Sequence, residues 1–260
     1  MLKVSKQKRI IYKLGGSVIT DKNKKELARR DVIESILKIV RDNAVAIVHG
    51  GGGFGHYVAH EVGLNLRPVT VEDARKVMES MDKLSTIVYD VARSVWPNVI
   101  LIKPRDFIIN KNLKIYDAYL DILATYYELG SIILTHGDVV PDLGEYRFSV
   151  CSGDVLVVLL SIIINPDAVV FLSDVDGLFT ADPKKNPNAE LIKDVKASEL
   201  YGKFEESSSK DVTGGMRLKV DTIRDLARIS DVYVLNGLNF KNLRKFVRGE
   251  NFVGTRVRKG

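Results

Sequence analysis

The sequence predicts an α/β protein in which a largely parallel sheet is covered by helices on both faces. Short apolar runs alternate with longer segments whose apolar residues recur at the helical period. Such alternation is typical of a parallel sheet, because parallel strands need long crossover connections. Several apolar runs also end in glycine-rich turns. Ligands bind at that end of the strands in open α/β sheets.

Six apolar runs have the length and composition of buried strands. These runs are Arg9–Leu14, Val45–His49, Val99–Ile102, Ser131–Thr135, Ala168–Leu172 and Asp231–Leu235. Each is followed by a turn signal or a helical pattern, so we expect them to form the central sheet.

Amphipathic segments fill the spaces between the strands. The longest is Val71–Val95, and Trp96-Pro97 ends its helical pattern. Asp117–Leu129 and Thr213–Ile229 are further expected helices, and a helix-like segment follows from Tyr57.

Two hairpins interrupt this pattern. One joins Phe107–Ile109 to Leu113–Ile115, and the other lies near Asp142–Ser149. Repeats and low-complexity linkers are lacking, so residues 1–260 are expected to form a single domain. A soft division falls near residue 165.

The composition favours anionic small molecules as partners. The formal net charge is +6, yet the sequence shows neither zinc-ligand spacing nor an RNA-binding aromatic motif, so no nucleic acid partner is expected. The longest apolar run, Val155–Ile164, is too short to span a membrane. The lone Cys151 cannot form an internal disulfide, and the N-terminus lacks the apolar region of a secretory signal. These features predict a cytoplasmic protein.

The most informative motif is the glycine run that follows the strand Val45–His49. Gly50, Gly51, Gly52 and Gly53 free the backbone N–H groups to reach an anion near a helix N-terminus. His56, a few residues on, adds a group that can be cationic near neutral pH. The motif therefore predicts a phosphate site.

The same run also has the spacing of a dinucleotide-binding fingerprint, Gly50-x-Gly52-x-x-Gly55. That interpretation needs an acidic residue at the end of the second strand, about 20 positions on. Glu72 and Asp73 have the spacing, but they open the long helix instead. A dehydrogenase is therefore disfavoured.

Two further strand ends carry lysine or aspartate. Lys13 precedes Gly15 and Gly16, so it is either a point charge for a phosphoryl group or a solvated lysine beside an ordinary turn. Asp174 and Gly177 follow the strand Ala168–Leu172, where they form either a ligand site or a plain turn. No Walker A loop occurs in the sequence.

Two helix starts complete the set of motifs. Gly153 and Asp154 open an apolar helix, where Asp154 either orients lysines or a metal ion or simply caps the helix. Gly215 lies in the first turn of the helix after Thr213, with Lys219 one turn further. This second anion cradle, separate from the first, suggests one phosphate donor and one acceptor.

In this order, the motifs KLGGS, HGGG, SGD, SDVDG and TGGM-x-x-K resemble the amino acid kinase superfamily, over nearly the whole chain. Within it, the combination with Phe54-Gly55-His56 is similar to the isopentenyl phosphate kinases. The resemblance implies a three-layer αβα sandwich that phosphorylates isopentenyl phosphate to the diphosphate with ATP and Mg²⁺. It also implies a homodimer, with the acceptor bound in residues 1–165 and ATP in residues 166–260.

The resemblance implies roles for particular residues. Those expected to contact ATP are Lys13, Gly15, Gly16, Lys22, Asp174, Gly177, Gly215 and Lys219. Those expected to hold the acceptor are Gly52, Gly53, His56 and Gly153. The catalytic set is Lys13, His56, Asp154 and Lys219, with Asp154 orienting the lysines and His56 donating to the acceptor phosphate. No residue is assigned to a metal ion.

One departure from the family pattern concerns Val155, since relatives often have a second aspartate after Asp154. The alternatives are another kinase of the superfamily, acting on fosfomycin, UMP or a carboxylate, and a non-catalytic nucleotide-binding protein. The prenyl tail of the acceptor needs an apolar slot, for which Met78 or Met81 on the long helix would supply a wall. His49 is expected to be structural.

Overall fold

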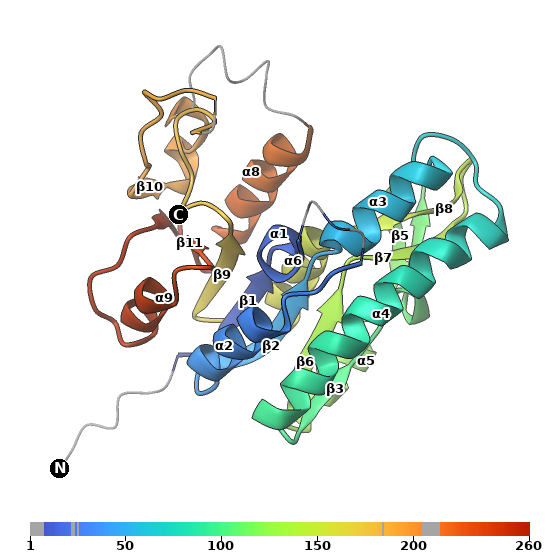
Figure 1. Cartoon of the computed structure of the whole chain (residues 1–260), viewed down its shortest axis with the longest axis horizontal. Coiled ribbons are helices and arrows are strands. Elements are labelled where there is room, and N and C mark those ends of the chain that lie inside the picture. The colour runs from blue at the N-terminus through green and yellow to red at the C-terminus, as the bar shows by residue number, and fades with distance from the viewer. Residues whose placement is uncertain (1–7, 22–23, 25, 184, 204–213) are drawn as a thin grey trace.

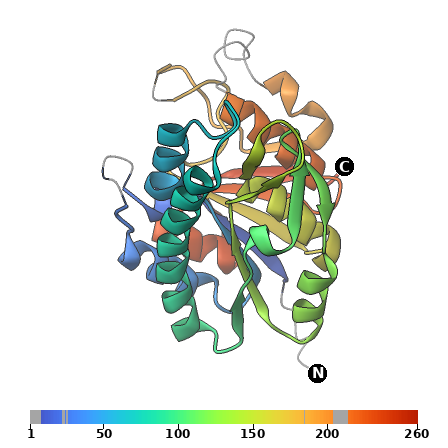
Figure 2. The same cartoon turned by 90° about the vertical axis from the view of Figure 1, so that its right-hand side faces the viewer.

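The computed structural model describes residues 8–21, 24, 26–183, 185–203 and 214–260, and of residues 214–219 it describes the backbone alone. Its centre is a twisted sheet with helices on both faces (Figures 1 and 2). In spatial order the strands are β10 (Asp194–Lys196), β12 (Thr255–Arg258), β11 (Asp231–Asn236), β9 (Ala168–Ser173), β1 (Ile10–Leu14), β2 (Ala44–His49), β6 (Ile132–His136) and β3 (Val99–Leu101). The pair β11–β12 is antiparallel, and the other neighbours in this sheet are parallel.

The central strand β1 shows why helices cover both faces. Ile11 packs into the hydrophobic cluster on one face, whereas Ile10, Tyr12 and Leu14 pack into the cluster on the other. Successive side chains of a strand point to opposite faces of the sheet. Because β1 carries apolar side chains on both faces, helices must cover both faces. Only Lys13 breaks the apolar run, near the carboxyl end.

The helices form the two outer layers. Those on the Tyr12 face are α2 (Arg30–Val40), α4 (Val71–Val95) and α9 (Phe240–Val247). Those on the Ile11 face are α5 (Asp121–Glu128), α6 (Gly153–Ile164) and α8 (Gly214–Leu226). Two more, α1 (Gly16–Ile19) and α3 (Gly52–Val62), begin at the carboxyl ends of β1 and β2. The expected three-layer αβα sandwich is confirmed.

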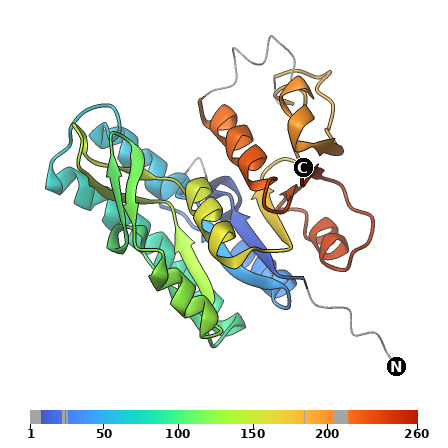
Figure 3. The ribbon, with the colours of Figure 1, turned by 180° about the vertical axis from the view of Figure 1, so that it is seen from behind.

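A second, smaller sheet extends from the central one. It consists of β5 (Lys114–Ala118), β4 (Ile108–Lys111), β7 (Asp138–Asp142) and β8 (Arg147–Cys151), in that order. Both predicted hairpins are present in it. Their union into one sheet, through a single parallel pair between Asn110 and Asp142, was not predicted. This sheet lies beside α3 and the first half of α4, as Figures 1 and 3 show.

Two predicted helix boundaries are wrong. The helix after the glycine run begins at Gly52 rather than after Tyr57, so the glycines form its first turn. The helix expected over Asp117–Leu129 begins only at Asp121, because Asp117 pairs with Ile109 in the small sheet. Tertiary pairing there overrides the helical pattern.

The long helix spans Val71–Val95 as predicted, and other boundaries lie within three residues of those predicted. The helix expected over Thr213–Ile229 spans Gly214–Leu226, and Thr213 lies outside the described residues. Along the part of the chain that the structure describes, no helix combines the length and apolarity needed to cross a lipid bilayer.

Candidate active site

The carboxyl edge of the central sheet brings the predicted motifs together. The parallel strands β1, β2, β6 and β9 all end at this edge, so their connecting loops converge there. Lys13 lies next to the last residue of β1, and the Gly50 turn follows β2 directly. Open α/β sheets bind ligands in the crevice at such an edge.

Two glycine turns contact each other through their backbones. A Cβ atom at Gly16 would lie 2.3 Å from the nitrogen and 2.6 Å from the Cα of Gly52. Gly52 itself has a φ of +48°, which L side chains rarely adopt. Gly50 donates its N–H to the carbonyl of Leu14 at 3.0 Å. These contacts hold the N-terminus of α3 against the end of β1.

Thr20, for which the sequence predicted no role, links the same two turns through hydrogen bonds. Its hydroxyl accepts a hydrogen bond from the N–H of Gly53 at 2.9 Å and donates one to the carbonyl of Gly16 at 2.7 Å. A threonine three residues after the KLGGS motif gives no pattern that could have revealed this role. The contact depends on two loops that are distant in sequence.

Lys13 and Asp154 form an ion pair across the edge. The Lys13 Nζ lies 2.7 Å from Asp154 Oδ1, and the side chains are 12% and 17% exposed. Asp154 is in the first turn of α6, whose N-cap is Ser152, with its hydroxyl accepting from the N–H of Val155 at 3.3 Å. Ser152 therefore caps the helix, and the carboxylate of Asp154 is paired with Lys13 instead.

Gly153 lets the lysine approach the start of α6. A Cβ atom at this position would lie 3.3 Å from the Cε of Lys13 and 3.3 Å from the carbonyl oxygen of His49. Both distances are tighter than ordinary van der Waals contact. Gly153, which was predicted to hold the acceptor, lines the cavity beside Lys13.

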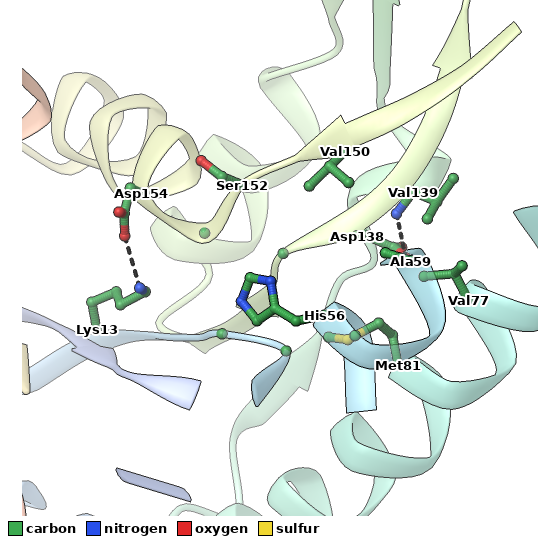
Figure 4. A pocket seen from close by; sticks show the side chains of 15 residues that line it. Lys13, His56, Ala59, Val77, Met81, Asp138, Val139, Val150, Ser152 and Asp154 are labelled. Atoms are coloured by element: carbon green, nitrogen blue, oxygen red, sulfur yellow. Dashed lines mark hydrogen bonds and ion pairs between the residues drawn. The ribbon is translucent and has the colours of Figure 1, made fainter. Parts of the chain in front are cut away.

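A cavity of about 180 Å³ lies at this edge. Its polar end is lined by Lys13, Gly50, Gly51, His56, Gly137, Ser152, Gly153 and Asp154. Its other end, which we call the apolar slot, is lined by the apolar side chains of Ala59, Val77, Met81, Val139 and Val150, with Gly55 and Asp138 beside them. Figure 4 shows His56 between the Lys13–Asp154 pair and the apolar slot.

The polar end suits an anion for two reasons. The N-termini of α3 and α6 both begin at residues that line it, and helix N-termini carry partial positive charge and unpaired N–H groups. Lys13 adds a full positive charge, and the exposed His56 adds a ring that can donate a hydrogen bond. The predicted residues Gly52 and Gly53 lie in the first turn of α3 but do not line the cavity, and the N–H of Gly53 is donated to Thr20.

The apolar slot continues into a small hydrophobic core. The buried part of this core comes from α3, α4 and β7 and includes Val58, Val77 and Val139. Met78 packs against this core, whereas Met81 lines the cavity. Of the two methionines proposed for the slot, Met81 is therefore the one that reaches it.

Two buried histidines lie beside the polar end. His49 and His136 end the paired strands β2 and β6, and their rings stack with centroids 5.1 Å apart. Burial lowers the pKa of His49 to about 3, and it also lowers the pKa of His136. Each Nδ1 lies near the carbonyl of the next residue, at 3.2 Å for His49 and 3.0 Å for His136. His49 is structural, as expected.

Asp138 is a cavity residue that the sequence did not reveal. Its side chain is fully buried, and its carboxylate pairs with the guanidinium of Arg105 at 2.7 Å. Burial raises the pKa of the Asp138 carboxyl, and the arginine opposes that rise. The available signal was the Gly137-Asp138 turn after β6, which resembles the other strand-end turns.

The turns after β9 and β11 form the other half of the edge. Ser17 donates to Asp174 at 3.0 Å, which ties the KLGGS turn to the expected nucleotide region. Gly177 packs against Thr255, since a Cβ atom there would lie 2.6 Å from its hydroxyl. The structure thus gives Gly177 a packing role. A Cβ atom at Gly15 would lie 2.6 Å from the carbonyl oxygen of Leu172, which draws β1 and β9 together.

Three predicted residues are described in part or not at all. Lys22 lies outside the described residues, and Gly215 and Lys219 are described only by their backbone, in the first turns of α8. Val155, which replaces the aspartate frequent in the family pattern, packs against the hydrophobic core of the Ile11 face. Burial raises the pKa of Cys151 to about 12, so its thiol is not a nucleophile here.

Among the described residues, no three His, Cys, Asp or Glu side chains cluster as metal ligands. Magnesium bound with a nucleotide needs only one or two carboxylates, because the phosphates supply other oxygens. Asp154 at the polar end is compatible with that kind of site.

Together, the parallel sheet, the Lys13–Asp154 pair and the glycine turns define an α/β protein built to bind phosphate groups at its carboxyl edge. Residues 8–236 match the amino acid kinase family. That match spans most of the chain, and the chain belongs to this family.

Curated relatives match over nearly their whole length. The isopentenyl phosphate kinase of Thermoplasma acidophilum is 32% identical, with 96% of this chain and 100% of the relative covered. The isopentenyl phosphate kinase of Methanothermobacter thermautotrophicus is 33% identical, with 95% and 98% covered. A crystal structure of an isopentenyl phosphate kinase substrate complex matches with a TM-score of 0.80 and 28% identity, over 96% of this chain and 100% of that one.

Proposed function

We propose that this protein transfers the γ-phosphoryl group of ATP to isopentenyl phosphate and releases isopentenyl diphosphate. The observation that carries the proposal is the two-ended cavity: a polar end with Lys13 and His56 joins directly to an apolar slot. A short prenyl monophosphate is divided in the same way, into an anionic phosphate and an apolar tail. The full-length relatives that carry this activity in their names support the same substrate.

The acceptor needs no strong general base. The second pKa of a phosphate monoester is about 6, so its oxygen is already anionic near neutral pH. The reaction then depends on in-line placement and on offsetting the repulsion between two anions. Lys13 would supply positive charge between them, and Asp154, 2.7 Å from its Nζ, would hold that charge in place.

His56 would bind the acceptor phosphate together with the first turn of α3. Its ring lies beside the polar end, and the N–H groups of Gly52 and Gly53 belong to that first turn. Hydrogen bonds from the His56 ring and from the N-terminus of α3 would fix the phosphate with its tail directed into the apolar slot, whereas the N–H of Gly53 is already donated to Thr20. Lys22, Gly215 and Lys219 would contact the phosphates of ATP.

The nucleotide would bind in residues 166–260, near Asp174, and the acceptor in residues 1–165. Mg²⁺ would accompany ATP, held by its phosphates and by Asp154, and when bound it offsets negative charge on the transferring group. We further propose that the protein acts as a cytoplasmic homodimer in isoprenoid biosynthesis.

Product analysis by ³¹P NMR tests this function. The purified protein is incubated with Mg-ATP and isopentenyl phosphate, and in parallel with fosfomycin, UMP or N-acetylglutamate. Two coupled diphosphate signals from isopentenyl phosphate, with no transfer to the other acceptors, are expected. Transfer to fosfomycin instead would overturn the proposed acceptor. ATP binding without any transfer would favour a non-catalytic nucleotide-binding protein.

A further inference from the structure

Four charged side chains form a network beside the cavity. Arg105, in the 3₁₀ turn Pro104–Asp106, donates to Asp138 at 2.7 and 3.1 Å. The same guanidinium donates to Asp82 at 2.8 and 3.3 Å. Lys103 reaches Asp82 from outside at 3.0 Å. Two carboxylates and two cations leave the network without net charge.

The network joins the two walls of the apolar slot. Asp82 is next to Met81 on α4, and Asp138 is next to Val139 at the start of β7. Met81 and Val139 face the cavity from these two elements. Arg105 is therefore a bridge between the α4 wall and the β7 wall, although it does not line the cavity itself.

The chemistry of the bridge makes it rigid. Arginine presents its N–H groups in a fixed planar fork, and here each carboxylate accepts two of its hydrogen bonds. The Asp138 side chain is fully buried and that of Arg105 is 17% exposed, so water screens the Asp138 pair little. A buried charge that loses its partner is costly, and the two walls are therefore held at one separation.

We infer that Arg105 is a specificity-determining positioning residue, which sets the distance between α4 and β7 and thereby the tail length that the apolar slot accepts. This inference rests on the proposed function, because the tail is that of the proposed acceptor. Arg105 acts through Met81 and Val139, and it makes no contact with the reacting phosphates in this account.

The variant Asp82→Asn tests the inference with the least harm to folding. It weakens the α4 arm of the bridge and leaves the buried Asp138–Arg105 pair intact, and the Asp82 side chain is 33% exposed. Lys103→Met is the matched control, because it removes the outer partner of Asp82 and leaves both arms of the bridge in place. Arg105→Lys is a second variant, which keeps the charge and loses the fork.

The measurement is steady-state kinetics with isopentenyl phosphate and with a ten-carbon prenyl monophosphate. In Asp82→Asn and Arg105→Lys, the preference in kcat/KM for the five-carbon acceptor is expected to fall about tenfold, since fit in an apolar pocket discriminates on that scale. The fall should come from the KM of the acceptors, with the KM of ATP unchanged. Lys103→Met should keep the wild-type preference.

The outcomes separate the inference from the proposed function. An unchanged preference in folded Asp82→Asn and Arg105→Lys proteins would overturn the inference, as would an equal loss in Lys103→Met. A fall in kcat alone, with the acceptor KM unchanged, would also overturn it. If the wild-type protein turns over neither prenyl monophosphate, the proposed function fails, and the inference fails with it.

Discussion

At the scale of single residues, close backbone contact shapes the polar end of the cavity. Gly16 and Gly52 lie so near each other that neither can carry a side chain without displacing the other turn. The N-terminus of α3 thereby faces the same cavity as Lys13. Positioning of this kind matters for phosphoryl transfer, because an error of about 1 Å can cost 10²-fold in rate.

We predict that Gly16→Ala lowers both stability and activity. The new methyl group would meet the backbone of Gly52 at 2.3 Å, and overpacking of this kind costs about 1–3 kcal/mol. We also expect kcat/KM to fall at least about tenfold through displacement of α3. Urea denaturation and acceptor kinetics check both effects. Gly202→Ala is the control, since a Cβ atom there meets nothing within 4 Å, and equal behaviour of the two variants would contradict the account.

Much of the candidate site could be predicted residue by residue because it lies in local motifs. Lys13, His56 and Asp154 were predicted from strand ends and helix starts, where short-range sequence pattern sets backbone position. Thr20 and Asp138 were missed, since each acts through partners more than 30 residues away: Gly53 for Thr20 and Arg105 for Asp138. A single sequence carries no sign of such partners.

At the scale of elements, the ends of β2 and β6 carry a buried pair of neutral rings. His49 and His136 are in register, and both have pKa values below the ordinary value for histidine because of burial. The unfolded chain takes up protons as the pH falls below about 6.5, whereas the folded chain holds His49 neutral down to about pH 3. The stabilisation that comes from keeping His49 neutral is therefore fully present above pH 6.5, and it is lost as the pH falls.

We predict that the free energy of unfolding falls between pH 7 and pH 5, with a contribution of about 2 kcal/mol from His49. The variant His49→Asn should show a smaller fall, because its side chain does not titrate in this range. Urea denaturation at the two pH values measures both differences. His60→Asn, at an exposed position on α3, serves as the control and should keep the wild-type dependence. An identical pH dependence in His49→Asn would contradict the assignment.

Helices and strands could be predicted where the spacing of the apolar residues and the positions of the glycines indicate the same element. All six predicted strands are present within two residues of their expected ends, because an apolar run between turns has few other uses. The small sheet could be predicted from the sequence only as two separate hairpins, since their assembly into one sheet depends on the parallel contact of Asn110 with Asp142. The start of α5 was misplaced for the same reason, as Asp117 pairs with a neighbouring strand.

At the scale of the whole molecule, the carboxyl edge of one sheet would serve two ligands. The cavity lies over the ends of β1, β2 and β6, and the turns after β9 and β11 lie on the other side of β1. The fold class could be predicted because strand and helix alternate throughout the sequence.

Because ATP and the acceptor are proposed to bind in two separate regions, each ligand should stabilise the protein independently of the other. A ligand at 100 times its Kd stabilises a protein by about 2.7 kcal/mol. We expect Asp174→Ala to reduce the rise in Tm caused by Mg-ATP and to leave the rise caused by isopentenyl phosphate. His56→Ala should show the opposite pattern. Thermal denaturation with each ligand alone measures this, and loss of both effects in both folded variants would contradict the two-region arrangement.

The proposal that the acceptor phosphate binds at the start of α3 is tested most directly by comparing two histidines on that helix. His56 lines the cavity, whereas His60 lies one helical turn further along α3 and does not line it. We predict that His56→Ala lowers kcat/KM for isopentenyl phosphate by about 10²-fold or more, because it removes positioning and charge stabilisation at the acceptor, whereas His60→Ala keeps wild-type turnover. Near-wild-type turnover of His56→Ala, or equal losses in both variants, would contradict the claim that the acceptor phosphate binds at the start of α3.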